Sequence, residues 1–195
     1  MGDTVCLLLT QSHDNPWVIY YRENEEIKHK SIVMLTDNLK HDTTAVATFQ
    51  PRLIEDIKEL KPNIDITKIH FWSDGAASQY KNRKIFSNIY HHKEDFGIKA
   101  DWSFWATSHG KGPWDGVGGK LKRSCTNAIQ QESDIRNPVD VYHHGVKAMP
   151  SVKFHWIASE EVDRTRKKLK KRFNKAERIE EGLQYKNILI IIIII

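Results

Sequence analysis

The order of its apolar segments constrains the fold of this chain more than any other feature of the sequence. Three β-prone runs come first, separated by the turn-forming residues His13–Pro16 and the charged linker Glu23–Lys30. Such short links predict an antiparallel meander. The three predicted strands are Val5–Thr10, Trp17–Arg22 and Ser31–Thr36. Helical and β-type periodicities then alternate, so the chain is predicted to be a mixed α/β domain.

Side-chain spacing predicts the elements after the meander. Thr43 and Thr44 can cap a helix that runs to about Leu60, and Pro51 inside it predicts a kink or a late start. The next predictions are strand Lys68–Ser73, helix Gln79–His92 and strand Ile98–Ala106. A Gly-rich loop at Gly110–Gly119 then leads towards a helix that begins near Trp114 to Gly118. The remaining predictions are an irregular segment at Pro138–Pro150, strand Lys153–Ala158 and helix Ser159–Gly182, with Ser159 as its N-cap. A three-stranded meander followed by two βα units is the order of an RNase H-like mixed sheet. In that fold the fourth and fifth strands run parallel to the first and lie beside it.

Composition excludes several classes of protein. The 195 residues are enough for one domain with a sizeable core, and 39% of them are hydrophobic, which excludes collagen-like, low-complexity and wholly disordered chains. Cys6 and Cys125 lie far apart, so a disulfide scaffold and a Cys-built zinc site are excluded. Met1–Thr10 has neither a basic n-region nor a cleavage site. We therefore expect an intracellular protein, nuclear or cytoplasmic.

The C-terminal run Ile188–Ile195 is entirely apolar. A transmembrane helix needs about 20 such residues, so this run is too short to cross a bilayer. We interpret it as a low-complexity tail at 188–195 that lies outside the domain. No membrane partner is expected, and no small-molecule substrate is evident from the sequence.

Positive charge is concentrated in the C-terminal third. The net charge is +5, whereas Lys120–Lys175 holds 14 basic and 6 acidic residues. The excess is densest in Arg164–Arg178, which fits either a solvated helix face or a helix that contacts phosphates. DNA is the partner that the second alternative predicts. The candidate nucleic-acid contacts are Lys81, Arg83, Lys111, Lys120, Lys167, Lys168, Lys170, Lys171 and Arg172.

Two acidic residues follow successive predicted strands. Asp74 ends the strand Lys68–Ser73, and Asp115 follows the strand Ile98–Ala106, so both could reach one sheet edge. Paired carboxylates there would suit Mg²⁺ or Mn²⁺ in phosphoryl transfer. Each residue also has a structural alternative, because Asp74-Gly75 is a common turn and Asp115 could cap a helix. His109 could position a water or a phosphate, or be a structural histidine.

Other familiar sites do not fit the sequence. Gly119-Lys120 lacks the upstream glycine and the following Ser or Thr of a Walker A loop, and Gly110–Gly119 does not match the GxGxxG pattern. His91-His92 and His143-His144 are adjacent pairs whose side chains diverge on a helix, which argues against zinc. These observations disfavour the corresponding nucleotide-binding enzymes and zinc proteins.

Two long segments of the chain resemble a group of transposon-derived proteins. Ser73–Arg83 matches a Ser-Asp-Gly-Ala-x-Ser-Gln-x-Lys-Asn-Arg stretch, and Ala106–Arg123 matches an Ala-Thr-Ser-His-Gly-Lys-Gly-Pro-x-Asp-Gly stretch that continues with Gly-Gly and Lys-Arg. Thr36–Asp42 resembles a third shared piece, and the resemblance covers about Pro16 to Asn187. It implies a transposase core of the DDE/DDD type, with Asp74 as the second catalytic acid and Asp115 as the third.

The first acid of such a core is not evident here. The resemblance implies an upstream acidic motif of the type Asp-Phe-x-Glu-Asn, which this chain lacks. We therefore expect an N-terminally truncated member whose catalysis is impaired. If Val5–Thr10 occupies the first strand, Asp14 would lie near Asp74 and could serve as a substitute metal ligand.

The expected organisation has four parts. These are a divergent start at 1–15, a truncated RNase H-like core at 16–130, an extension with a basic helix at 131–187, and the tail at 188–195. The main functional hypothesis is a transposase-derived DNA-processing domain, which in the ancestral enzyme cleaved and transferred DNA strands with Mg²⁺ or Mn²⁺. The alternatives are a non-catalytic nucleic-acid-binding module and a structural or interaction protein without a DNA role.

Overall fold

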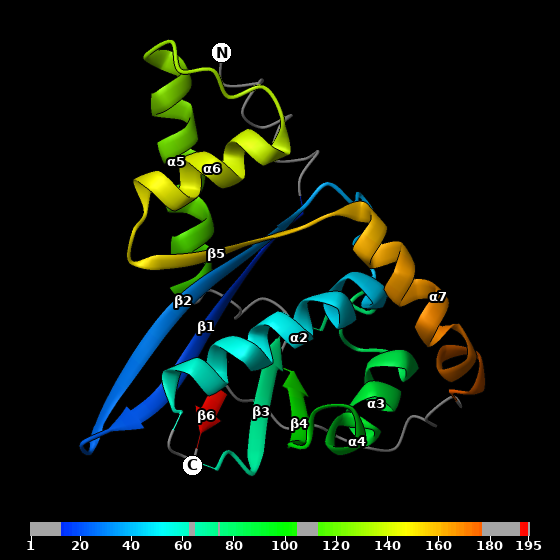
Figure 1. The fold of residues 1–195 in the computed structure, drawn as a ribbon. Coiled ribbons are helices and arrows are strands. Elements are labelled where there is room, and N and C mark those ends of the chain that lie inside the picture. The colour runs from blue at the N-terminus through cyan, green and yellow to red at the C-terminus, as the bar shows by residue number, and fades with distance from the viewer. Residues whose placement is uncertain (1–12, 63–64, 74, 105–112, 177–191, 195) are drawn as a thin grey trace. The chain divides into compact units, whose positions relative to one another are not determined.

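A computed structural model describes residues 13–62, 65–73, 75–104, 113–176 and 192–194. The described chain is a mixed α/β fold with six helices and six strands (Figure 1). In chain order they are β1 His13–Glu23, β2 Glu26–Thr36, α2 Thr43–Leu60, β3 Lys68–Ser73, α3 Arg83–Tyr90, α4 His92–Phe96, β4 Lys99–Phe104, α5 Pro113–Gln130, α6 Pro138–Ala148, β5 Val152–Ile157, α7 Ser159–Lys175 and β6 Ile192–Ile194.

The strands form two sheets, and the chain divides into two compact units. The sheet orders are β5-β2-β1-β6 and β3-β4. The first unit comprises Met1–Val18, Lys30–Lys40 and Lys111–Glu161, and the second comprises Ile19–His29, His41–Gly110 and Val162–Ile195. The β1–β2 hairpin contributes residues to both units, and each unit has its own packed interior.

The hairpin differs from the sequence prediction. The charged linker predicted at Glu23–Lys30 is wrong, because only Asn24 and Glu25 form the turn. Their φ angles of 49° and 67° are those of a type I′ turn, which matches the twist of paired strands. The turn predicted at His13–Pro16 is also wrong, since these residues begin β1. Proline is tolerated near the start of a strand, where a missing N–H costs little. The strand predicted at 5–10 lies outside the described residues, so the meander is seen here as one hairpin.

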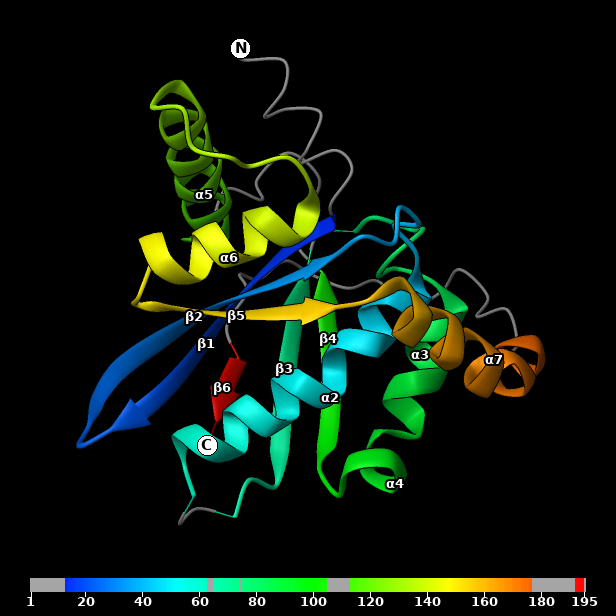
Figure 2. The ribbon, with the colours of Figure 1, turned by 45° about the horizontal axis from the view of Figure 1, so that its top comes forward.

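The first unit packs two helices against a parallel strand pair (Figure 2). Ser31–Thr36 of β2 pairs in parallel with Val152–Ile157 of β5, and α6 contacts both β5 and α5. Their apolar side chains form one buried cluster: Val33, Leu35, Leu121, Cys125, Ala128, Ile135, Val141, Met149 and Phe154. Burial raises the pKa of the Cys125 thiol to about 11, so this cysteine is a core residue and a poor nucleophile at neutral pH.

One predicted helix and one segment predicted as irregular are both helices in this unit. Helix α5 begins at Pro113, which confirms the helix predicted to begin near Trp114 to Gly118, although the loop predicted as far as Gly119 does not extend into 113–119. Helix α6 replaces the irregular segment predicted at Pro138–Pro150. A capping box begins it, in which Asn137 and Asp140 bond each other's backbone amides and Pro138 fills the first turn. Burial of one face of each helix outweighs their poor intrinsic propensities.

The second unit contains the parallel pair β3 and β4, and both strands lie where the sequence predicts them. Their register runs from Lys68↔Lys99 to Ser73↔Phe104. Phe71 stacks on Trp102 with ring centroids 4.9 Å apart, and the indole N–H of Trp102 donates to Ser73 Oγ at 2.9 Å. Helix α2 crosses this pair in Figure 1, and it runs from Thr43 to Leu60 without the late start that Pro51 suggested.

The helix predicted at Gln79–His92 is two shorter helices. Asn82 caps α3 by accepting hydrogen bonds from the amides of Lys84 and Ile85, so the helix begins later than predicted. His91 lies between α3 and α4. Helix α4 ends at Gly97, whose φ of 77° is left-handed and favours glycine.

His92 is a buried core residue. Its Nδ1 lies 2.6 Å from the carbonyl of Ile98, and its ring contacts Phe71 and Phe96 at centroid distances of 5.6 and 4.8 Å. Burial lowers the pKa of His92 below 6.5, which outweighs the opposing effect of the Ile98 carbonyl. The folded chain therefore favours the neutral imidazole.

This burial predicts that stability falls on mild acidification. In the unfolded state His92 binds a proton near pH 6.5, whereas in the folded state its pKa is lower. The contribution of His92 to the free energy of unfolding is therefore fully present above pH 6.5 and is lost as the pH falls towards the folded pKa. The contribution can reach about 1.4 kcal/mol per pH unit. The free energy of unfolding can be measured by urea unfolding with tryptophan fluorescence between pH 5 and 7.5. Its slope against pH should be shallower for His92→Gln than for the unmodified chain. His143→Gln, which alters an exposed histidine, should keep the original slope.

Three residues of the isoleucine run belong to a strand. Ile192–Ile194 of β6 pairs in parallel with Ile19–Tyr21 of β1 and contacts β3. The run is expected from its composition to lie outside the domain, whereas Ile192–Ile194 pairs with β1 within the second unit. Within the described part of the chain, no helix is long and apolar enough to cross a membrane.

Candidate functional site

Helix α7 carries the densest positive charge of the described chain. Val162 and Phe173 are its buried residues, and Leu169 is half-buried, so one narrow apolar stripe holds the helix to its unit. The sequence RTRKKLKKRFNK places cations on most of the remaining surface. The predicted helix end at Gly182 lies outside the described residues, and the described helix ends at Lys175.

An acceptor from elsewhere in the chain marks the start of α7. Ser159 is the first helical residue and not the predicted N-cap, and its amide and hydroxyl both donate to Asp37 Oδ1, at 2.8 and 2.6 Å. Glu160 and Glu161 occupy the first turn, where acidic side chains favour the helix dipole. The acceptor at the start of α7 therefore lies 122 residues away in the sequence.

Two ion pairs fix the orientation of α7 within the second unit. Arg166 donates to Asp42 at 2.5 Å, and Arg172 donates to both carboxylate oxygens of Asp95 at 2.5 and 2.8 Å. The hydrogen bond from Arg172 lowers the pKa of Asp95, and burial only partly opposes this. Bidentate pairing holds a guanidinium in one plane, so Arg172 is positioned before any ligand arrives.

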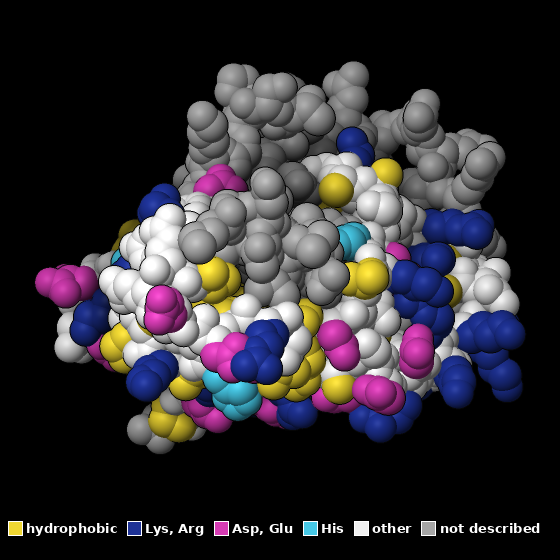
Figure 3. Space-filling view, turned by 90° about the horizontal axis from the view of Figure 1, so that it is seen from above, with side chains coloured by type: hydrophobic (Ala, Val, Ile, Leu, Met, Phe, Trp, Pro, Cys, Tyr) yellow, Lys and Arg dark blue, Asp and Glu magenta, His cyan; other side chains and the backbone are white. Residues whose placement is uncertain are grey.

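The other cations of α7 remain available to solvent or to a ligand. Lys167, Lys170, Lys171 and Lys175 are exposed and have no hydrogen bond or ion pair with another described residue. Lys168 is also exposed and contributes to the lowered pKa of Asp95. Figure 3 shows Lys and Arg side chains gathered on the right, the side on which α7 lies in Figure 1. These charges make the exposed surface of α7 strongly positive.

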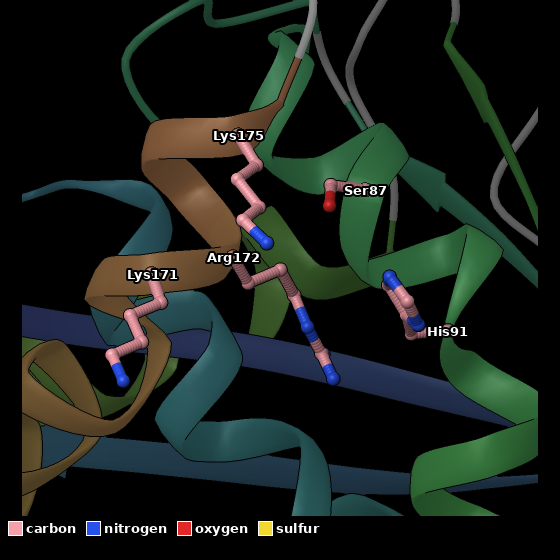
Figure 4. A pocket seen from close by; sticks show the side chains of 5 residues that line it. All are labelled: Ser87, His91, Lys171, Arg172 and Lys175. Carbon is pink, nitrogen blue, oxygen red and sulfur yellow. The ribbon is translucent and has the colours of Figure 1, made fainter.

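A pocket of about 330 Å³ lies between α3 and α7. Ser87 of α3, His91 after it, and Lys171, Arg172 and Lys175 of α7 line it (Figure 4). In that view Lys175 and Arg172 extend from α7 towards the side that holds Ser87 and His91, whereas Lys171 extends away. The Nζ of Lys84 lies 5.6 Å from the ring centre of Phe173, so a cation–π contact joins the two helices near this pocket.

The sequence prediction identified only part of this site. Lys171 and Arg172 were candidate contacts, whereas Ser87, His91 and Lys175 were not. Ser87 and His91 are four residues apart, as are Lys171 and Lys175, so each pair shares a helix face. That spacing could have grouped them, but it does not indicate that the two faces meet. His91 and His92 were weighed together for zinc, and the structure gives them different surroundings, pocket and core.

The predicted catalytic residues are only partly described. Asp74, His109 and Lys111 lie outside the described residues, and Asp14 is placed in β1 without a described side chain. Asp115 is exposed in the first turn of α5, where a carboxylate favours the helix dipole. The convergence of Asp74 and Asp115 therefore stays a prediction.

The three metal ligands expected from the sequence are not all described, so the metal site stays a prediction. Among the described residues, no group of three or more His, Cys, Asp or Glu residues is arranged to hold a metal ion. They therefore show no fit for Mg²⁺ or Mn²⁺, and no chemical step is derived through a metal. Lys120 is exposed on α5, whereas Lys81 and Arg83 are exposed at the start of α3, on a different helix from the α7 cations.

The fold and this surface define a mixed α/β protein that carries a strongly basic helix. Residues 11–192 match the model of a family described as Domain of unknown function (DUF8701), and the chain belongs to that family. No curated protein and no solved structure matches the chain.

Proposed function

We propose that this chain is a nucleic-acid-binding module descended from a DDE-type transposase core, and that it holds DNA along α7. The observation that carries the proposal is a row of exposed, unpaired lysines on a helix fixed by the Arg166–Asp42 and Arg172–Asp95 ion pairs. If α7 were only a solvated helix face, its own arginines would not need to fix the helix by ion pairs.

The dimensions of α7 suit a DNA backbone. Lys167 and Lys175 are eight residues apart, or about 12 Å along a helix that rises 1.5 Å per residue. Duplex DNA carries one charge per about 1.7 Å, so this length of helix can face several phosphates. Contacts of this kind position DNA without reading its sequence. A DNA partner would also favour the nuclear alternative for the location of the protein.

A charge-neutralising variant tests this proposal. Lys167→Gln, Lys168→Gln and Lys170→Gln together remove three cations from α7, and each lost phosphate contact should lower the slope of log K against log salt by about 0.9. We expect the slope to fall by two to three and the affinity at low salt to fall at least tenfold, as measured by fluorescence anisotropy with a labelled duplex.

A matched control separates α7 from net charge. Lys58→Gln, Lys93→Gln and Lys99→Gln also remove three exposed lysines, but from α2, α4 and β4. This variant should bind DNA nearly as the unmodified chain does. Equal losses in both variants would show a nonspecific effect of net charge, and no binding by the unmodified chain at low salt would favour an interaction protein without a DNA role.

Metal-dependent cleavage of DNA is the second candidate function. The RNase H-like arrangement that it requires is supported by the chain order of the hairpin β1–β2 and the parallel pair β3–β4, although the described strands of the two lie in separate sheets. Asp74 comes directly after β3, at the carboxyl end of a parallel pair, where ligands of α/β sheets bind. Mg²⁺ or Mn²⁺ would be the cofactor, and Asp74, Asp115 and Asp14 the proposed ligands.

Nicking of supercoiled DNA tests this second candidate. Activity that needs Mg²⁺ or Mn²⁺ and is lost in both Asp74→Asn and Asp115→Asn would support it. DNA binding with a steep salt slope but without nicking would leave the binding module as the function.

A further inference from the structure

We infer that Tyr90, at the end of α3, stacks on an unpaired base, so that the chain prefers single-stranded to duplex DNA. This inference rests on the proposed nucleic-acid-binding function and adds to it the form of DNA that binds most tightly. Tyr90 is 84% exposed, more than any other exposed large hydrophobic residue among those described. An aromatic ring left in water beside a basic helix is the arrangement with which proteins hold unpaired bases.

The ring of Tyr90 has an open face. Its aromatic neighbour is His91, with ring centroids 5.1 Å apart and the two planes at 86°. In an edge-to-face contact of this kind the imidazole covers at most one face of the phenol ring, so the other face can receive a base. The Glu94 carboxylate lies 2.9 Å from Nδ1 of His91, which helps to hold the imidazole beside Tyr90.

The charges next to Tyr90 suit a base better than a phosphate. Asp95 neutralises Arg172 by a bidentate pair. The carboxylate of Glu94 adds a negative charge beside His91. The surface around Tyr90 is therefore closer to neutral than the exposed lysines of α7, and an uncharged base can approach it without repulsion.

Cations that can hold the same strand lie on both helices. Tyr90 and Ser87 are three residues apart on α3, and Ser87 lines the α3–α7 pocket with Lys175, which extends towards it from α7 (Figure 4). Arg83 is exposed seven residues before Tyr90, two helical turns away on the same face of α3. A strand whose base stacks on Tyr90 can therefore place its phosphates beside Lys175 and Arg83.

Stacking on Tyr90 selects single strands. In a duplex each base is paired and lies within the stack, so its π-face is accessible only after unstacking, which costs free energy. A protein partner would instead need a contiguous apolar patch. The other exposed large hydrophobic residue described in the second unit is Ile27, which belongs to the β1–β2 hairpin and not to α3 or α7. A single ring among charged side chains therefore fits a base better than an apolar protein surface.

Three labelled probes test the inference on the full chain. They are a strand of thymidines, a strand of the same length with abasic residues in their place, and the duplex of the thymidine strand with its complement. We expect anisotropy to show that the thymidine strand binds at least fivefold more tightly than the abasic strand, which has the same phosphates, and more tightly than the duplex. Attraction by charge alone would favour the duplex, because it carries one charge per about 1.7 Å and a single strand carries half as many.

Variants of Tyr90 locate the effect. Tyr90→Ala should lower the affinity for the thymidine strand at least fivefold and leave the affinity for the abasic strand unchanged. The slope of log K against log salt should also stay the same, because no charge is removed. Tyr90→Phe keeps the ring and should retain the preference, whereas Ile27→Ala, the matched control, should change none of the affinities. Because Tyr90 and Ile27 are exposed, these variants should keep the urea unfolding midpoint of the unmodified chain.

The possible failures are distinguishable. Equal affinity for the thymidine and abasic strands, or a preference that persists in Tyr90→Ala, would overturn stacking on Tyr90 while leaving salt-dependent binding along α7 intact. Tighter binding of the duplex than of the thymidine strand would overturn the preference for single strands. Absence of binding to all three probes at low salt would contradict the proposed function, and this inference with it.

Discussion

Gly145→Ala is expected to destabilise the chain by about 1–3 kcal/mol, although alanine is the better helix former. Gly145 is buried in α6, and a Cβ built there would lie 2.6 Å from Cε1 and 2.8 Å from Cζ of Phe154, and 3.2 Å from Cδ1 of Leu121. Phe154 belongs to the core of the first unit. Because its ring cannot move without displacing that core, overpacking should outweigh the gain in helix propensity.

The same substitution elsewhere in this unit should have the opposite sign. Gly116 is exposed in α5, and a Cβ there would meet nothing within 4 Å. Gly116→Ala is therefore expected to stabilise by about 0.5–1 kcal/mol. Urea unfolding of both variants checks the pair. If both substitutions stabilised the chain alike, the close packing of α6 on β5 would be contradicted.

Elements with a strong local period were predictable from the sequence. The bounds of β3 match the prediction, and β4 lies within its predicted range, because alternation along these strands follows from burial of one face. The extent of α2 was also predicted, but its cap was not. Thr43 and Thr44 were expected to cap the helix with their side-chain oxygens. The Asp42 carboxylate, one residue earlier, does so instead by accepting hydrogen bonds from the amides of Thr44 and Ala45.

Features that depend on residues distant in the sequence were not predictable. Pro138–Pro150 was predicted as irregular, yet α6 forms there, and its Val141 packs into one core with Leu121 and Cys125 of α5. The start of α7 at Ser159 was predicted, but its acceptor Asp37 was not, because no local pattern indicates a partner 122 residues away. Tertiary burial overrides propensity in the first case, and a long-range acceptor replaces a local cap in the second.

Part of the candidate site was predictable from the sequence, and part of it was not. The positive charge of α7 is visible in the sequence, because a charge run needs no partner to be recognised. The pocket was not visible, because it requires Ser87 and His91 of one helix to face Lys175 of another. The sequence also did not indicate which cations are neutralised by a carboxylate. Arg172 was predicted as a nucleic-acid contact, yet its guanidinium is paired with Asp95 and serves first to hold α7 in place.

Asp42→Ala is expected to destabilise the second unit by about 2–4 kcal/mol. Asp42 Oδ1 caps α2 by accepting from the amides of Thr44 and Ala45, and Oδ2 accepts from Arg166. Losing the cap costs about 1 kcal/mol. The variant also removes the closest acceptor of Arg166, which leaves Thr44 Oγ1 at 3.3 Å from Nη1 and the Asp163 carboxylate at 3.8 Å from Nε. Nε and Nη2 are already buried without hydrogen-bond partners in the described structure, so a partly buried guanidinium without its closest carboxylate adds the remaining cost.

Separating the two roles of Asp42 requires variants that keep one of them. Asp42→Asn retains an oxygen for the cap but loses the charge, and Arg166→Met retains the cap but removes the partner. Each should cost less than Asp42→Ala in urea unfolding, and the Asn/Met double variant should cost less than the two single costs added together. Additive costs would contradict a direct Asp42–Arg166 interaction.

The pH dependence supplies an independent check of the same pair. Burial raises the pKa of Asp42, but the hydrogen bond from Arg166 and those from the α2 amides outweigh it, so the net pKa is lowered. The stabilisation is therefore present above the ordinary value of 3.8 and is lost as the pH falls through the lower folded pKa. Arg166→Met should weaken this acid dependence below pH 4, while the separate loss between pH 6.5 and 5 due to His92 should persist. A variant that kept the full acid dependence would show that Arg166 does not stabilise the charged form of Asp42.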